Sequence, residues 1–375
     1  MQRVFAHIIL KTLLAARRVT ARTMTDPSTI RSIGCVELSR LGDVLIILPM
    51  IQALRKMFPN AAISVVVQKP YAGLFDFVPA VDKVYAFDRT NSPAGFLRAR
   101  KTLSKQPFDL LFSMSPSLRN ALLTLSTPSV GAIGYFTASD STTPFLHRTP
   151  IQSIGMKIES AEYHMDNIYE RAGNICDAMQ IPREVNMTWK IGKESVGKTT
   201  RILNEQGYTV TRPLVVIHPF AGWSYRQWPL KRFIALADTL AREYNGFVVF
   251  IGTEAEFSMN ERVFKPEGKD RLIIIETSDV KDLVGVISQA HLFIGNDSGP
   301  LHLANLLGIQ TIGLFGPASP QLTGNQGNNA AHIYHHVECS PCNQERCLHP
   351  DNPCMDQISQ EEIMQIVRQY LDKRP

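Results

Sequence analysis

The feature that most constrains this chain is a repeated alternation of short apolar runs with helix-spaced segments. Short apolar runs fit buried strands, and the segments between them fit helices. The expected strands are residues 33–39, 62–67, 81–87, 108–114, 130–134, 214–218, 247–251, 272–275, 292–295 and 311–315. Strands that alternate with helices need crossover connections, which build parallel sheets. The sequence therefore predicts an α/β fold with two successive parallel-sheet domains.

A more polar stretch, from about residue 160 to 212, separates the two alternations and has the character of a domain connection. It contains one helical pattern at residues 162–179. The last segment, about residues 360–372, has the pattern of an amphipathic helix that stands alone. We expect two Rossmann-like domains that face a central cleft, with ligands at the carboxyl ends of the strands.

Positive charge is concentrated at the start of the chain. Residues 1–32 hold six basic residues and one acidic residue, which accounts for the whole net charge of +5. The neutral remainder argues against nucleic acid as the main partner. On a helix, Lys11, Arg18 and Arg22 lie opposite an apolar side, as in helices that rest on anionic membranes. We expect a basic amphipathic leader over residues 1–31; a frayed segment or a wrongly chosen start codon is the alternative.

Asp43 closes the turn between the first expected strand and the helix after it. The turn reads S-R-L-G-D over residues 39–43. In one interpretation Asp43 is only the residue that caps the helix start, a common position for aspartate. In the other it faces a ligand as a general base and takes a proton from an acceptor hydroxyl.

A second turn reads N-D-S-G-P-L-H over residues 296–302, again between an expected strand and a helix. Backbone N–H groups at a helix start bind phosphate, and Gly299 lets the backbone approach a ligand closely. Ser298 adds a hydroxyl donor, and His302 lies one turn further along. The alternative for His302 is a helix histidine with an internal partner. Asp297 would repel phosphate, so we expect it to accept hydrogen bonds from ribose or sugar hydroxyls.

Two further turns complete the set of candidate binding residues. The first reads H-P-F-A-G-W-S-Y-R-Q-W-P over residues 218–229, and its Arg226 has the paired donors that hold a diphosphate. The second reads G-T-E over residues 252–254, where Glu254 accepts from ribose hydroxyls or merely caps the next helix. A solvent-exposed loop arginine remains the alternative for Arg226.

Several common nucleotide motifs are missing from the sequence. There is no G-x-G-x-x-G turn and no Walker phosphate loop, which disfavours dinucleotide oxidoreductases and nucleoside triphosphatases. There is also no D-x-D pair to hold a divalent metal on a diphosphate. We therefore expect no metal and no cofactor, with Arg226 and helix ends neutralising the phosphate charge.

Together these motifs resemble glycosyltransferase family 9, the heptosyltransferase family that builds the inner core of lipopolysaccharide. The resemblance covers about residue 32 to the end and rests on L-S-R-L-G-D-V-L-I-I-L-P, H-P-F-A-G-W with R-Q-W-P, G-T-E, G-N-D-S-G-P-L-H-L-A and the C-S-P-C tail. It implies a GT-B fold with an acceptor-binding domain at residues 32–190 and a nucleotide-sugar-binding domain at residues 191–358. A C-terminal helix at residues 359–375 follows.

The resemblance also implies roles for single residues. Asp43 matches the proposed general base of a metal-independent, inverting transfer, and Arg226 matches a basic residue at the diphosphate. Glu254 matches a ribose- or nucleoside-binding acid. The residues that match the donor-binding turn are Asp297, Ser298, Gly299 and His302. Phe220 departs from the family, because many members have glycine at that point of the loop.

Four cysteines near the end of the chain have the spacing C-x₂-C-x₄-C-x₆-C. They are Cys339, Cys342, Cys347 and Cys354. A structural zinc site, reduced thiols in a turn-rich loop and a disulfide are all compatible with this spacing. The six cysteines of the chain fit a reducing compartment better than a secreted disulfide framework.

From the resemblance we expect a glycosyltransferase that uses a nucleotide sugar, with an ADP-sugar such as ADP-heptose favoured. The expected acceptor is a lipid-linked saccharide such as the lipopolysaccharide core. We expect a cytoplasmic protein that reaches the inner-membrane surface through its basic leader. The alternatives are a nucleotide-sugar epimerase or hydrolase on the same fold, and a catalytically dead protein that binds the membrane surface.

Overall fold

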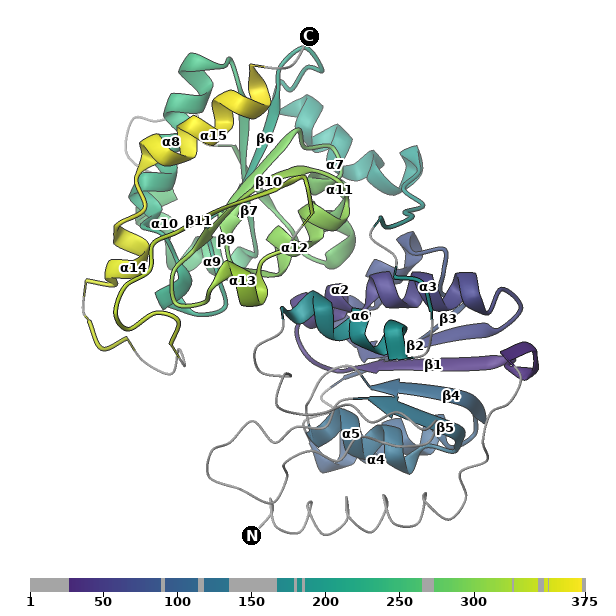
Figure 1. Cartoon of the computed structure of the whole chain (residues 1–375). Helices are drawn as coiled ribbons and strands as arrows, with labels where there is room; N and C mark the ends of the chain where they lie inside the picture. Colours follow the sequence, from purple (N-terminus) through teal and green to yellow (C-terminus); the bar gives the residue numbers. More distant parts are fainter. Residues whose placement is uncertain are drawn as a thin grey trace. The chain divides into compact units, whose positions relative to one another are not determined.

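A computed structural model describes residues 27–88, 92–113, 118–134, 167–178, 181–183, 186–264, 273–325, 327–342, 347–349 and 351–372. The chain divides into two compact units, Met1–Lys190 and Ile191–Pro375 (Figure 1). Each unit is built around one parallel sheet, so the predicted α/β class with two parallel-sheet domains is confirmed. Most of the predicted leader lies outside the described residues. Within the ranges given above, no helix is long and apolar enough to cross a membrane.

The first unit contains a five-stranded sheet in which every pair of neighbours is parallel. Its strands are β1 (Ser32–Glu37), β2 (Ala62–Gln68), β3 (Lys83–Phe87), β4 (Phe108–Ser113) and β5 (Ser129–Gly134). Their order is β3-β2-β1-β4-β5. The central strand β1 is buried, which explains why its sequence reads as an uninterrupted apolar run rather than as an alternation.

Most helices of the first unit connect these strands. The full set consists of η1 (Pro27–Thr29), α2 (Leu41–Ile46), α3 (Leu48–Met57), η2 (Lys69–Phe77), α4 (Pro93–Leu103), α5 (Leu118–Ser126) and α6 (Ile168–Ala178). Of these, η1 precedes β1 and α6 follows β5. The helix-spaced apolar positions of residues 43–57 predict one helix, but the chain breaks at Ile47 into α2 and α3. Pro49 has no N–H to continue the first helix but is well suited to the first turn of the next.

The second unit contains a six-stranded sheet, also parallel throughout. Its strands are β6 (Leu214–His218), β7 (Phe247–Gly252), β8 (Ile273–Glu276), β9 (Leu292–Asn296), β10 (Gln310–Phe315) and β11 (Ala330–Tyr334). Their order is β11-β10-β9-β6-β7-β8. The sequence analysis missed β11. This edge strand is mostly half-buried and has only one deeply buried apolar side chain, so it carries no apolar run.

The helices of the second unit cover its sheet. They are α7 (Lys193–Glu205), η3 (Ser224–Arg226), α8 (Leu230–Glu243), α9 (Glu254–Met259), α10 (Glu261–Phe264), α11 (Val280–Ile287), α12 (Gly299–Leu306), α13 (Pro320–Thr323), α14 (Pro353–Asp356) and α15 (Gln360–Leu371). The last helix does not stand alone, because Ile363 and Val367 belong to the core that also contains strand residues of β6 and β9. The indole N–H of Trp228 donates to the Ile358 carbonyl just before α15 at 2.9 Å.

Both sheets reverse their strand order at one internal position. In the first sheet the chain runs outward from β1 through β2 to β3, and β4 then begins on the other side of β1. In the second sheet the same reversal separates β6 from β9. At such a switch point the two loops at the strand ends lead away from each other, so their diverging backbones leave space for a ligand.

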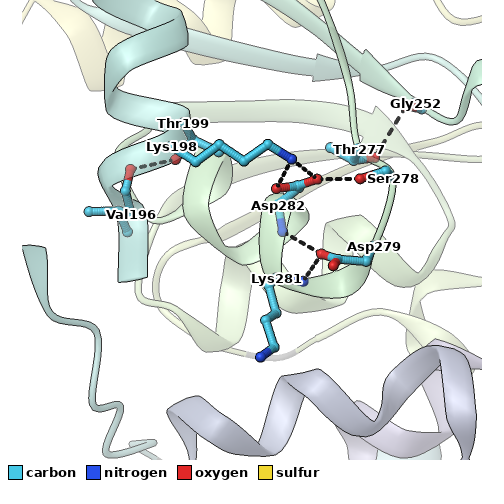
Figure 2. A network of polar contacts seen from close by, with 9 residues as sticks. All are labelled: Val196, Lys198, Thr199, Gly252, Thr277, Ser278, Asp279, Lys281 and Asp282. Atoms are coloured by element: carbon cyan, nitrogen blue, oxygen red, sulfur yellow. Dashed lines mark hydrogen bonds and ion pairs between the residues drawn. The ribbon is translucent and has the colours of Figure 1, made fainter. Parts of the chain in front are cut away.

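Helix α7 enters the second unit by packing on α11. Figure 2 shows the Lys198 ammonium between both carboxylate oxygens of Asp282, at 2.7 and 2.8 Å. The Ser278 hydroxyl donates to the same carboxylate at 2.6 Å. The helices touch most closely at Gly285, where a Cβ atom would lie 2.7 Å from Oγ1 of Thr199. The contact therefore requires a residue without a side chain at position 285.

Two glycine substitutions test this docking. Gly285→Ala forces a methyl group against buried Thr199, so we expect it to lower the free energy of unfolding by about 1–3 kcal/mol. Gly197→Ala in α7 is the control, because a Cβ atom there meets nothing within 4 Å. It should raise that free energy by about 0.5–1 kcal/mol through better helix propensity. Urea unfolding measures both, and equal effects would contradict the close contact.

Candidate functional site

The turn after β9 is tied to the loop after β6 by Asn296, the last residue of β9. Its side chain is fully buried. The amide oxygen accepts from the backbone N–H of Trp228 at 2.9 Å, and the amide nitrogen donates to the Pro219 carbonyl at 2.7 Å. One buried amide thus bridges the two loops that diverge at the switch point of the second sheet. The β9 turn (residues 296–302) and residues 218–229 consequently form one structural unit.

Asp297 brings two predicted binding residues together. The Arg226 guanidinium lies 2.9 Å from its Oδ2 atom, and Nε2 of His302 lies 3.7 Å from its Oδ1 atom. Among the described residues Oδ2 has no hydrogen-bond partner, so the contact with Arg226 is an ion pair without hydrogen-bond geometry. Asp297 and His302 are almost completely buried, whereas the Arg226 side chain is 24% exposed. The partly open guanidinium is therefore the group in this cluster best placed to meet an anionic ligand.

Ser298 occupies the position that caps α12, but its side chain does not cap the helix. Its hydroxyl instead lies 3.2 Å from Nδ1 of His218. Gly299 begins α12, and Pro300 follows it in the first helical turn. The start of α12 thus carries the positive end of the helix dipole, just after Asp297, which pairs with Arg226. This arrangement suits the binding of a phosphate group.

His218 is a site residue that the sequence analysis quoted only as part of a motif. It ends β6, is 6% exposed and contacts Ser298. Burial lowers the pKa of its imidazole to about 4, against a weaker opposing effect of the charge of Glu256. At neutral pH His218 is therefore uncharged and acts as a hydrogen-bonding group rather than a cation. Its place at the end of an expected strand, residues 214–218, was the signal available in the sequence.

Glu254 does not join the cluster around Asp297 in the contacts that the described residues make. It is exposed and is the first residue of α9. The alternative that Glu254 caps this helix is wrong, because Thr253 is the capping residue. The carboxylate that completes the cap belongs to Glu256, which accepts from the backbone N–H of Thr253 at 2.8 Å. Glu254 is left with its side chain in solvent.

Phe220, the departure from the family pattern, lies in the core of the second unit. It is 1% exposed and packs edge-on against Phe257, with Phe264 beside it. At Gly252 a Cβ atom would come within 2.7 Å of the Phe220 ring. The bulky ring at position 220 is thus accommodated by a glycine on the neighbouring strand, and it faces the core.

Asp43 lies in the first unit, in the first turn of α2. It is half-buried, and its Oδ2 atom accepts from the backbone N–H of Arg40 at 3.0 Å. Arg40 is the capping residue, so the interpretation of Asp43 as the capping residue itself is wrong. The carboxylate does stabilise the start of α2, because it binds one of the N–H groups that have no partner within the helix.

The first unit also contains a buried carboxyl group that the sequence analysis missed. Glu37 ends β1 and is 1% exposed. Burial raises the pKa of its carboxyl group to about 7, and the nearby charge of Asp43 adds to this rise. The sequence does not mark Glu37 as a site residue, because only the fold shows that its carboxyl group lies beside Asp43.

The four clustered cysteines are free thiols, as are Cys35 and Cys176. Burial, together with smaller effects of Cys339, Cys347 and Cys342, raises the pKa of Cys354 to about 11. The four thiols therefore lie near one another. Across the ranges that the structure describes, which omit residues 343–346, no group of three or more His, Cys, Asp or Glu side chains is arranged to hold a metal ion.

Two successive parallel-sheet domains are the architecture of GT-B glycosyltransferases, and solved structures of such enzymes share this fold. The solved structure of a family 9 glycosyltransferase from Veillonella parvula matches with a TM-score of 0.72 and 20% identity, over 93% of this chain and 100% of that one. Escherichia coli ADP-heptose lps heptosyltransferase II matches with a TM-score of 0.69 and 16% identity, over 91% and 99%. The predicted GT-B fold is confirmed.

The sequence comparisons give the family. The profile of glycosyltransferase family 9 (heptosyltransferase) matches residues 96–351, and the chain belongs to this family. A curated relative is the lipopolysaccharide core heptosyltransferase OpsX of Haemophilus influenzae, which is 22% identical over 81% of this chain and 85% of its own length. The protein is therefore a glycosyltransferase.

Protonation of His218 gives a test of the buried cluster. In the unfolded chain His218 takes up its proton near pH 6.5, whereas in the folded chain it does so only near pH 4. The neutral imidazole therefore leaves the free energy of unfolding at its full value above pH 6.5, and that free energy falls as the pH is lowered toward 4. His218→Asn should reduce this acid-induced loss of unfolding free energy by up to about 3 kcal/mol. Unfolding by urea at pH 7, 5.5 and 4.5 measures the difference. Exposed His336→Asn is the control, and an unchanged pH dependence in His218→Asn would contradict the burial of this group.

Proposed function

We propose that this chain transfers heptose from ADP-heptose to a lipid-linked saccharide of the lipopolysaccharide core, with inversion at the anomeric carbon and without a metal. The observation that carries the proposal is the partly open Arg226 guanidinium on buried Asp297, beside the start of α12. Such a site neutralises a diphosphate with a guanidinium and backbone N–H groups. The named activities of the Escherichia coli and Haemophilus influenzae relatives supply the sugar and the acceptor class.

The proposed donor site assigns a role to each residue of the β9 turn and its neighbours. Arg226 and the start of α12 at Ser298 and Gly299 bind the diphosphate and stabilise the charge that develops as it leaves. His302 donates to the same group, while Asp297 holds the Arg226 guanidinium and the His302 ring in place. For Glu254 we propose contact with the ribose, since its exposed carboxylate at the start of α9, just after β7, is open to a ligand.

Asp43 is the proposed general base. It takes the proton of the acceptor hydroxyl as that oxygen forms a bond to the anomeric carbon, and the bond from that carbon to the diphosphate breaks. The electron pair leaves with ADP, and the sugar inverts because attack and departure occur on opposite faces. The hydrogen bond from the Arg40 backbone to Oδ2 fixes the carboxylate for this task.

The two domains and the basic leader have separate roles in the proposed reaction. Residues 32–190 would bind the acceptor and residues 191–358 the nucleotide sugar. The basic residues of segment 1–31 would hold the protein against the cytoplasmic face of the inner membrane, where a lipid-linked acceptor is presented.

Deletion of residues 1–26 should then reduce sedimentation with anionic vesicles and leave transfer to a soluble acceptor unchanged.

Nucleotide binding tests the donor site directly. In calorimetric titrations without added metal, we expect ADP to bind more tightly than UDP or GDP, and a chelator to have no effect. Arg226→Ala should weaken ADP binding by about 10- to 100-fold through loss of a charge-assisted hydrogen bond, and Arg226→Lys should weaken it less. Exposed Arg242→Ala is the control. Equal affinity for all three nucleotides would contradict an ADP-sugar donor.

Replacement of Asp43 tests the proposed base. Asp43→Asn keeps an oxygen that can accept from the Arg40 backbone, so the start of α2 should remain intact. Turnover of ADP-heptose with a lipopolysaccharide-core acceptor should fall by about 10²-fold or more, with an unchanged Kd for ADP. Release of ADP measures turnover. Parental turnover in this variant would remove Asp43 from the mechanism.

A further inference from the structure

The loop between β1 and α2, residues 38–40, is held by three side chains from two other elements of the first unit, α5 and β2. Asn120 on α5 accepts from the Leu38 backbone N–H at 3.2 Å. Gln68 at the end of β2 donates to the carbonyls of Leu38 and Ser39 at 2.6 and 3.1 Å. Arg119 donates to the Leu38 carbonyl at 2.5 Å. This loop leads directly into the helix turn that carries Asp43.

Glu37 completes this set of contacts from within β1. Its Oε1 atom accepts from the Ser39 backbone N–H at 3.0 Å and from the side-chain amide of Asn120 at 3.2 Å. Glu37 and Asn120 are both almost completely buried. They lie at the switch point between β1 and β4. The Glu37 carboxyl group is therefore at the carboxyl end of the sheet, where folds of this kind generally bind their ligands.

Two charged groups interact with this carboxyl group, and a third titratable group lies beside Asp43. Asp43 on α2 interacts with it as a like charge, and Arg119 on α5 interacts with it as an opposite charge. Tyr71 in η2 lies beside Asp43 and Arg40, and its own pKa is raised by burial. The β2 contact, Gln68, is neutral. Glu37 is therefore a buried second carboxyl group next to the carboxylate of Asp43.

We propose that Glu37 is a positioning residue for Asp43, which holds the loop that carries Asp43 and places a second carboxyl charge beside it. The inference rests on the proposed role of Asp43 as the base. Like charges repel, so an ionised Glu37 makes proton uptake by the Asp43 carboxylate more favourable and makes it a stronger base. The proton from the acceptor still moves to Asp43, and Glu37 takes no part in bond making or breaking.

Turnover as a function of pH separates this role from a purely structural one. Burial and the Asp43 charge raise the pKa of Glu37 to about 7, so Glu37 is mostly protonated at pH 6 and mostly ionised at pH 8. Glu37→Gln keeps an oxygen for the Ser39 and Asn120 hydrogen bonds and removes only the charge. The ratio of parental to Glu37→Gln turnover should be near one at pH 6 and rise to roughly 3- to 10-fold at pH 8.

Asp109→Asn is the matched control. Asp109 lies at the opposite, amino edge of the same sheet, where its carboxylate accepts from the backbone N–H groups of Arg31 and Ser32 at 2.8 and 2.9 Å. The exchange is chemically the same, so its turnover ratio to the parent should not change with pH. Glu37→Ala removes the loop contacts as well as the charge, and should lower turnover at every pH. Circular dichroism and ADP binding confirm that each variant is folded.

A double mutant distinguishes failure of this inference from failure of the proposed function. If Asp43→Asn retains parental turnover, the proposed base role is wrong and the inference falls with it. If Asp43→Asn is impaired, Glu37→Gln should cause no further loss in that background at pH 8, because Glu37 acts through Asp43. A turnover ratio that stays constant from pH 6 to 8, or a full further loss in the double mutant, would overturn the inference.

Discussion

The reversal of strand order inside each parallel sheet is the constraint on which the candidate sites depend. Where β1 meets β4, and where β6 meets β9, the loops at the carboxyl ends leave in opposite directions. Their backbone polar groups then lose the partners that a continuing ladder would supply, and burial without a partner is costly. Each unit solves this with a buried asparagine, Asn120 in the first and Asn296 in the second. The fixed loops in turn place the candidate functional side chains.

The two switch points differ in charge, and this difference fits different chemistry. In the second unit the Asp297 carboxylate is paired with Arg226 and lies near His302, so the partly exposed guanidinium is the group that can meet an anion. In the first unit Glu37 lies beside Asp43, so two carboxyl groups share one small region. In the proposed reaction the cluster in the second unit binds the leaving diphosphate and the cluster in the first unit provides the general base.

Periodicity and turn chemistry predicted much of the fold. Ten strands and the two turns with Asp43 and the β9 motif were placed because apolar runs and glycine-containing strand–helix junctions are local properties. The edge strand β11 was missed, since it needs no apolar run, and the break between α2 and α3 at Ile47 was missed despite Pro49. For the site, Arg226, Asp297 and Ser298 were named from their turns, whereas Glu37, Asn120 and His218 were not chosen.

By itself the sequence determined the α/β class, the family motifs and the residue types available at each strand end, because these depend on neighbours along the chain. Only the tertiary structure decided which of these residues meet. Asn120 lies more than eighty positions from Leu38, and Asp297 more than seventy from Arg226, yet both pairs are joined across a switch point. The structure also decided that Glu256 rather than Glu254 completes the cap of α9. Burial likewise decided the charge states of Glu37 and His218. Their pKa values are shifted because the fold removes water from them, which no local sequence pattern records.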